Sequence, residues 1–600
     1  MALWVLGPLP AAALGVDDLD PEREWRVEEV IISGNAAFSS AELLAEMLTR
    51  RPSGYLPWKG RPAFDAVTFR TDLERLRRFY EARGYYGARL SHDLEVDEGR
   101  GLVTARVRVR ENQPVVVVEV SVALRSDDFD GREDALAGAL PVKVGDRFTE
   151  ESYQEAQSRL RRYLLERGHA WVRVERAAKV DLGRLEARVR YDVWPGPKAW
   201  FGPTRVEGAS RVEPGVILRE LTYREGEMFS AEKLATSEQR ISALGFFRSV
   251  RIAPVETQEK SRTVLMRVKV AERPLRDVKL GLGYGTEDQF RGQATWRHRN
   301  WFGGGRDLSL LLKFSDITRS IGATFTQPYF PGDRNRAVLD LQQAQDDEET
   351  FLLNATRFGP RLEHRFSPTL SAFWGYRLEF AKLNNVAPAT IRALGGIERE
   401  GIVSGPSAGL SWDATDDPLS PTRGSVLSIT ADQGGAFWGG DFSFYKVTAE
   451  AKSYRRLGPA LVLAGRLKIG LADSLGSARK FPLFERFYSG GDRSVRGFGR
   501  RRLGPLSSSD DPLGGLSLVE GSMELRRSLT EALGAAVFLD FGQVSTRPVD
   551  PPLDNVRFAA GFGFSYATPV GPLRLDVGFP FDPPPGDQAW QVHFSIGQYF

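Results

Sequence analysis

Two hydrophobic patterns divide this chain near residue 274. Before it, apolar residues recur every three or four positions in three segments, 64–90, 148–174 and 229–252. This spacing predicts three helices, each burying one face. After residue 274 the pattern changes to strict alternation of apolar and polar residues, which predicts strands. The chain is therefore expected to have an α+β part followed by an all-β part.

The three helical segments belong to a repeat. Each predicted helix ends at a glycine (Gly84, Gly168 and Gly245), and alternating strands such as 102–109 and 185–193 follow. A glycine directly after a helix favours a left-handed residue that closes the last turn. The glycines lie 84 and 77 residues apart, which is the period of a small domain. The expected unit is a strand, a helical segment and a strand pair, with helices on one face of a small sheet.

Long alternating strands dominate the C-terminal part. The segment "TLSAFWGYRLEF" (369–380) places aromatic and aliphatic residues on one face and mostly small or charged residues on the other, and "LVLAGRLKIG" (461–470) repeats this. One such strand also fits a soluble sandwich, but repetition favours a closed barrel with an apolar outside. Residues 276–600 number 325, which at about 20 residues per strand and turn predicts roughly 16 strands.

Composition excludes several classes of protein. The 81 Lys+Arg nearly balance the 78 Asp+Glu, so no nucleic-acid partner is predicted. Cysteine is absent, which rules out disulfides, Cys-ligated metals and thiol nucleophiles. No run of about 18 apolar residues predicts a membrane-spanning helix. Residues 1–20 have the apolar core and small residues of a signal peptide without its basic start, and the alternative is a frayed apolar tail.

Candidate enzyme motifs lack the required context. "GPSAG" (405–409) matches a nucleophile elbow but leads into an alternating strand, so Ser407 is interpreted as structural. The five histidines show no metal-ligand spacing, and "GLGYG" (281–285) has no βαβ unit around it. We therefore expect no enzyme, no cofactor and no metal site.

Several segments resemble one family. "IISGNAAFSSAEL", "RRFYEARGYYGARL" and "ALGFFRSVRI" resemble POTRA domains. "LSWDATDDPLSPTRGSVLSI", "FLDFGQV" and "ATPVGPLRLDVGFP" resemble barrel strands of the insertase superfamily that contains BamA and TamA. The resemblance implies POTRA domains at 25–112, 113–197 and 198–274 and an outer-membrane barrel at 275–600. Three POTRA domains are most similar to TamA, because BamA typically has five and two-partner secretion transporters have two.

The resemblance also implies a function. Members of the superfamily insert unfolded outer-membrane clients, including autotransporters, from the periplasmic side. The ending "WQVHFSIGQYF" resembles the C-terminal signal of outer-membrane barrels. A TamB-like inner-membrane protein, outer-membrane lipid and lipopolysaccharide are the further partners expected. The alternatives are a two-partner-secretion-type transporter that exports its substrate through the lumen, and a passive pore.

Glycines mark the expected lateral gate. The first strand, about 278–284, contains Gly281 and Gly283, and Gly285 follows it; the last strand, about 592–600, contains Gly597 and ends at Phe600. Glycine weakens strands. We therefore predict that these two strands pair weakly and open toward lipid.

The segment "GGDRSVRGFGRRR" (490–502) holds the candidate lumen motif. Val495, Arg496, Gly497 and Phe498 resemble the tip of the family's sixth extracellular loop, which folds into the barrel. A confined arginine needs a carboxylate, since it cannot lose its charge. Asp540 is the predicted partner and Asp576 the second choice. Gly497 is expected to permit a tight turn and Phe498 to pack against the wall. Residues 500–502, all arginine, are expected to face solvent or lipopolysaccharide phosphate.

Overall fold

The chain forms two compact units, which we describe separately. The first comprises Met1–Glu207, Leu218–Ala243 and Val250–Val270, and the second Gly208–Ile217, Leu244–Ser249 and Ala271–Phe600. The computed structural model describes residues 15–20, 23–52, 61–125, 133–138, 140–255, 261–418, 420–476, 481–550, 553–568, 571–583 and 588–596.

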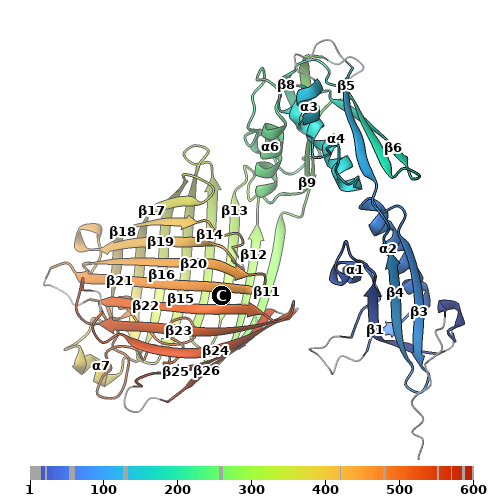
Figure 1. Ribbon diagram of the computed structural model, residues 1–600. Coiled ribbons are helices and arrows are strands. Elements are labelled where there is room, and N and C mark those ends of the chain that lie inside the picture. Colours follow the sequence, from blue (N-terminus) through green and yellow to red (C-terminus); the bar gives the residue numbers. More distant parts are fainter. Residues whose placement is uncertain are drawn as a thin grey trace, which may run out of the picture. The chain divides into compact units, whose positions relative to one another are not determined.

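Three α+β domains precede the barrel (Figure 1), which confirms the predicted fold class. Their sheets have the orders β2-β1-β4-β3, β5-β7-β6 and β8-β10-β9. In each, the first long strand pairs in parallel with the last: β1 with β4, β5 with β7, β8 with β10. The elements are β1 (Trp25–Ser33), α1 (Ser40–Glu46), β2 (Ala63–Phe64), α2 (Ala66–Ala82), β3 (Arg89–Asp97), β4 (Leu102–Arg110), β5 (Val116–Leu124), α3 (Glu133–Gly138), α4 (Glu150–Leu165), β6 (Arg173–Asp181), β7 (Glu186–Trp194), β8 (Trp200–Glu207), α5 (Pro214–Leu218), α6 (Ala231–Ala243), β9 (Phe247–Pro254) and β10 (Thr263–Glu272).

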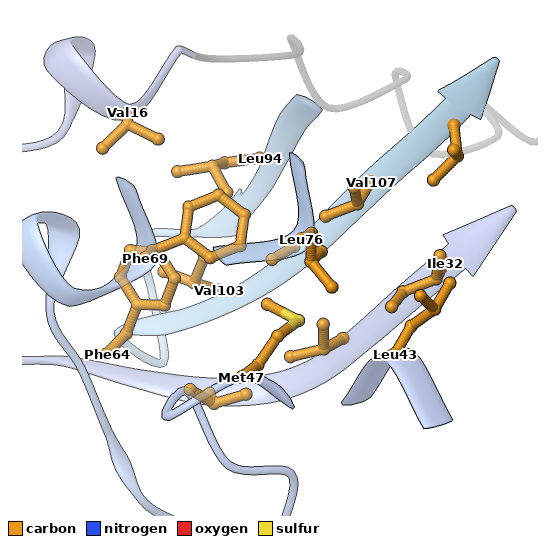
Figure 2. Packing of buried hydrophobic residues seen from close by; sticks show 14 of the residues in the cluster. Val16, Ile32, Leu43, Met47, Phe64, Phe69, Leu76, Leu94, Val103 and Val107 are labelled. Atoms are coloured by element: carbon orange, nitrogen blue, oxygen red, sulfur yellow. The ribbon is translucent and has the colours of Figure 1, made fainter. Parts of the chain in front are cut away.

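The first domain shows how the helical pattern is used. Phe69 and Leu76 of α2 are fully buried, and Figure 2 shows them with Leu94, Val103 and Val107 of the sheet. Burial of such side chains contributes about 1.5–3 kcal/mol each. The expected leader, 1–20, lies outside the described residues up to residue 14. Its described end packs into this core through Val16 and Leu19, so the folded domain begins before residue 25.

The repeat glycines join successive domains. Gly84 and Gly168 both have φ +91°, as predicted for a helix end. Their carbonyl oxygens also accept hydrogen bonds from backbone N–H groups of the next domain, Val115 at 2.9 Å and Ala199 at 2.8 Å. A Cβ on Gly84 would lie 2.4 Å from the carbonyl oxygen of Phe148. Glycine therefore serves both to close the helix and to allow the next domain to approach.

Sixteen antiparallel strands form a closed barrel (Figure 1), as predicted. They are β11 (Arg276–Gly285), β12 (Gln289–His298), β13 (Asp307–Phe314), β14 (Thr318–Pro328), β15 (Asn335–Glu348), β16 (Phe351–Arg365), β17 (Leu370–Asn384), β18 (Glu400–Asp413), β19 (Gly424–Gly434), β20 (Phe444–Gly458), β21 (Leu461–Ser474), β22 (Ser517–Ser528), β23 (Leu533–Ser545), β24 (Arg557–Thr568), β25 (Gly571–Pro580) and β26 (Gln591–Ile596). Helix α7 (Pro388–Ala393) lies between β17 and β18.

The faces of the barrel are inverted relative to a soluble protein. On β17, Trp374 is 73% exposed whereas Glu379 is fully buried. Glu379 instead forms ion pairs with Arg357 and Arg377. Apolar side chains thus face outward and charged side chains face the lumen, as a membrane barrel requires. Among the described residues, no helix is both long and apolar enough to cross a membrane.

Glu272 closes the third domain at the end of β10. Its carboxylate accepts hydrogen bonds from the backbone N–H groups of Ser210, Arg211 and Val212 at 2.9–3.0 Å. Burial acts to raise the pKa of Glu272, but these N–H donors outweigh it and lower the pKa below the ordinary 4.5.

We predict that Glu272→Gln destabilises this loop by about 1–2 kcal/mol. Because the folded-state pKa is depressed, the stabilisation is present above pH 4.5 and is lost as pH falls through the lowered pKa. Hydrogen exchange of the amides of residues 210–212 between pH 7 and pH 4 measures it. A pH-independent difference between the wild type and Glu272→Gln would contradict this assignment.

Candidate functional site

The loop between β21 and β22 enters the barrel lumen. We name residues 475–516 loop six. Its two limbs are joined by a pair of backbone hydrogen bonds between Phe487 and Gly515, both 2.9 Å. Phe487 packs with Phe442, Phe444 and Leu518 in a buried apolar cluster of the lumen. The base of the loop is therefore fixed to the barrel wall before the arginine-rich tip begins.

Arg496 lies in a cluster of carboxylates. Its Nε donates to Asp540 Oδ2 at 2.8 Å and its Nη2 to Asp540 Oδ1 at 2.9 Å, a bidentate pair. Its backbone N–H also donates to Asp540 Oδ2, at 3.1 Å. Asp576 lies 3.7 Å from Nη1. Arg496 is 5% exposed and Asp540 is fully buried. The structure thus brings together Arg496 and both carboxylates selected from the sequence.

Glu524 was not selected from the sequence. It lies on β22, and its Oε2 accepts from Arg496 Nη1 at 2.7 Å, closer than Asp576. A signal was available: Glu520, Ser522 and Glu524 alternate along one face of β22, and Ser522 is in register with Asp540. Arg496 also stacks on the ring of Phe538, with its Cζ 3.4 Å from the centroid. The guanidinium is therefore enclosed by charge and by an aromatic face.

The remaining motif residues fit the loop against β23–β25. Val495 and Phe498 are buried and pack with Leu503 and Ala559. Gly497 was expected to make a tight turn, but its φ is not in the left-handed region. A Cβ there would lie 2.3 Å from that of Ala559. Glycine is needed at this position for close approach to the wall and not for a turn.

The expected exposure of the following arginines is wrong for two of them. Arg500 donates from both terminal nitrogens to Glu348, at 2.5 and 3.0 Å, and Arg501 donates to the same carboxylate at 2.8 Å. Glu348 ends β15 and is 9% exposed. Arg502 has no such buried partner; its Nη1 donates to the carbonyl of Asp510 at 3.3 Å. Loop six crosses the lumen and places these cations against a buried acid.

Glu485 provides another anchor, in the short 3₁₀ turn Leu483–Glu485. It forms ion pairs with Arg377 of β17 and with Lys446 of β20, the latter at 2.9 Å. Burial acts to raise the pKa of Glu485, but Lys446 and Arg377 outweigh it and hold the pKa at about 2. Loop six is thus tied to the wall at Glu348, at Glu485 and at the Arg496 cluster.

The predicted gate strands are neighbours in the barrel. Tyr284 is in register with Ile596 and Gly285 with Ser595, and the N–H of Thr286 donates to the carbonyl of Phe594 at 3.0 Å. Leu280 and Leu282 of β11 are 77% and 81% exposed.

The predicted gate glycines are placed only in part. Gly281, Gly283 and Gly285 occupy the alternate, lumen-facing positions of β11. Gly597 and Phe600, the other predicted gate residues, lie outside the described residues. Among the described residues, no group of three or more His, Asp or Glu could hold a metal ion.

These features define a transmembrane β-barrel with a lumen-filling loop, preceded by three α+β modules. A model described as the Omp85 superfamily domain matches residues 300–600, and the POTRA model, described as surface antigen variable number repeat, matches 25–112, 128–196 and 201–273. The chain belongs to the Omp85 superfamily. Its barrel lies in the outer membrane and its POTRA domains lie in the periplasm.

Relatives carry the name BamA. The outer membrane protein assembly factor BamA of Nitratidesulfovibrio vulgaris is 30% identical over 449 residues, which cover 73% of this chain and 56% of that protein. BamA of Neisseria meningitidis is 22% identical over 97% of this chain and 79% of its own length. The crystal structure of BamA from Haemophilus ducreyi lacking POTRA domains 1–3 has a TM-score of 0.68 at 20% identity, covering 80% of this chain and 99% of that one. The predicted closeness to TamA stays a prediction.

Removing one member of the arginine cluster should be costly. We predict that Asp540→Ala lowers barrel stability by about 3–5 kcal/mol, because Arg496 is left with an incomplete partner set. The double change Arg496→Asp with Asp540→Arg should restore little, since the new carboxylate at position 496 would lie beside Glu524. Unfolding of the detergent-solubilised barrel, followed by its gel-mobility shift, measures this. Full recovery in the charge swap would contradict the role assigned to Glu524.

Glu348 should control the far end of the loop tip. We predict that Glu348→Gln weakens both arginine contacts and increases protease cleavage of residues 499–510 at least several-fold. Glu349→Gln is the matched control, because Glu349 is exposed and lies 3.9 Å from Arg502. Equal cleavage in the two variants would show that Glu348 does not hold the loop.

Proposed function

We propose that this protein inserts β-strand-rich outer-membrane clients, autotransporters among them, through the seam between β11 and β26. The observation that carries the proposal is the seam itself. Among the described residues its register comprises the two pairs at Tyr284 and Gly285, whereas β25 and β26 share six. Strand edges with few backbone bonds are the sites where another strand adds.

The blocked lumen supports insertion over export. Loop six crosses the lumen and is held there by Arg496, Arg500 and Glu485 in buried ion pairs. A two-partner-secretion-type transporter would need this loop to leave so that substrate could pass. A passive pore would need an open path in the same place. Lateral opening at β11 and β26 requires neither.

The POTRA sheets offer edges to extended clients. Strands β5 and β6 are the outer strands of the second sheet, so each has one edge without a partner strand in that sheet. An extended client segment adds to such an edge by backbone hydrogen bonds, before it reaches the barrel. A TamB-like partner at the first POTRA domain belongs to the same proposal, as do outer-membrane lipid and lipopolysaccharide around the barrel. No covalent chemistry, cofactor or metal is proposed.

A disulfide across the seam tests the function. Gly283 is a poor position, because a Cβ there would lie 2.6 Å from Arg291 Nε. Tyr284→Cys with Ile596→Cys uses a registered pair in a chain without other cysteines. We predict that the oxidised form loses at least tenfold in insertion of a client barrel into liposomes and recovers on reduction.

A second disulfide serves as the control. Ala294→Cys with Leu312→Cys joins β12 to β13, away from the seam, and should leave insertion unchanged. Unimpaired insertion by the locked seam would refute lateral gating, and client release into the liposome lumen would favour export.

A further inference from the structure

The seam has a lumen-side latch built from side chains. Arg291 of β12 lies opposite Gly283 of β11. Its Nη2 reaches past β11 and donates to the carbonyl of Ile596 on β26, at 3.3 Å. Its Nη1 donates to Asp288 at 3.2 Å, and the side chain is 1% exposed. An arginine of the second strand thus holds the last strand directly.

Gly283 makes this crossing possible. A Cβ at that position would lie 2.6 Å from Arg291 Nε and 2.7 Å from the carbonyl oxygen of Ile596. Any other residue would therefore displace the arginine or the last strand. The absence of a side chain at Gly283 serves the closed seam as well as weakening the strand.

His593 forms the second half of the latch. It faces the lumen from β26 and is 6% exposed. Its Nε2 donates to the backbone carbonyl of Arg496 at 2.7 Å, and its Nδ1 lies 3.3 Å from Glu287 Oε1. Glu287 belongs to the turn between β11 and β12, and the same oxygen accepts the N–H of Asp492 at 2.8 Å. The last strand, the first hairpin and loop six therefore meet at one histidine and one carboxylate.

We propose that Glu287, Arg291 and His593 form a latch that makes opening of the seam depend on the docking of loop six. While the loop is docked, its Arg496 carbonyl and Asp492 N–H orient His593 and Glu287 toward each other. When the loop leaves, both contacts are lost and β26 is held by Arg291 and the backbone pairs alone. Two sites that bias one opening equilibrium are energetically coupled. The proposal rests on the lateral gate proposed above and names its control.

Hydrogen exchange of the full-length protein in phospholipid nanodiscs, without any client, tests the latch. The amide of Thr286, which donates to Phe594, reports seam opening. We expect His593→Ala to raise its exchange rate about tenfold, the effect of losing a buried hydrogen bond to a charged partner. Gln591→Ala, on the same face of β26, is the matched control and should change nothing.

Coupling to the loop is tested by combination. Arg496→Gln, which undocks loop six, should raise seam exchange by itself, and adding His593→Ala should raise it little further. Additive effects, or seam exchange unchanged by Arg496→Gln, would overturn the proposal. Glu287→Gln and Glu348→Gln give the same test from the hairpin and from the far loop anchor, if either first variant fails to assemble. Because no client is present, failure of the latch is distinct from failure of the insertion function.

Discussion

A buried guanidinium that cannot be neutralised is the constraint on which this barrel depends. Arg496 is enclosed by Asp540, Glu524 and, slightly farther away, Asp576. Without the arginine, three carboxylates from three adjacent strands would face one another in a confined lumen. Without the carboxylates, the loop would carry an unpaired buried charge. Loop six and the wall formed by β22, β23 and β25 therefore stabilise each other.

The position of this one residue determines much of the remaining geometry. With Arg496 fixed, the following arginines reach Glu348 on the opposite side of the lumen, and the preceding turn presents Asp492 to Glu287. The loop thus fills the lumen and touches the seam at the same time. In this arrangement, closing the lumen and stabilising the seam are consequences of a single docking event.

The sequence determines the fold more completely than the site. Alternation alone gives the strand count, since every barrel strand must present one apolar and one polar face. The Arg496–Asp540 pair was accessible too, because few acidic residues alternate inward near the family-like motif. Glu348 was not accessible: it is about 150 residues away in the sequence, and only the path of the loop brings it to Arg500. The role of Gly283 depends on Arg291, which strand register places beside it and periodicity does not reveal. The same holds for the domain joints, where the carbonyl of Gly84 is used and its φ alone was foreseen.

The most direct measurement is a structure of the full-length protein in a lipid membrane, arrested with a partly inserted client barrel. Lateral gating predicts a client strand hydrogen-bonded to β11, Ile596 separated from Tyr284, and His593 displaced from Glu287. A client segment inside the lumen, with loop six expelled and the Tyr284–Ile596 pairing intact, would contradict it.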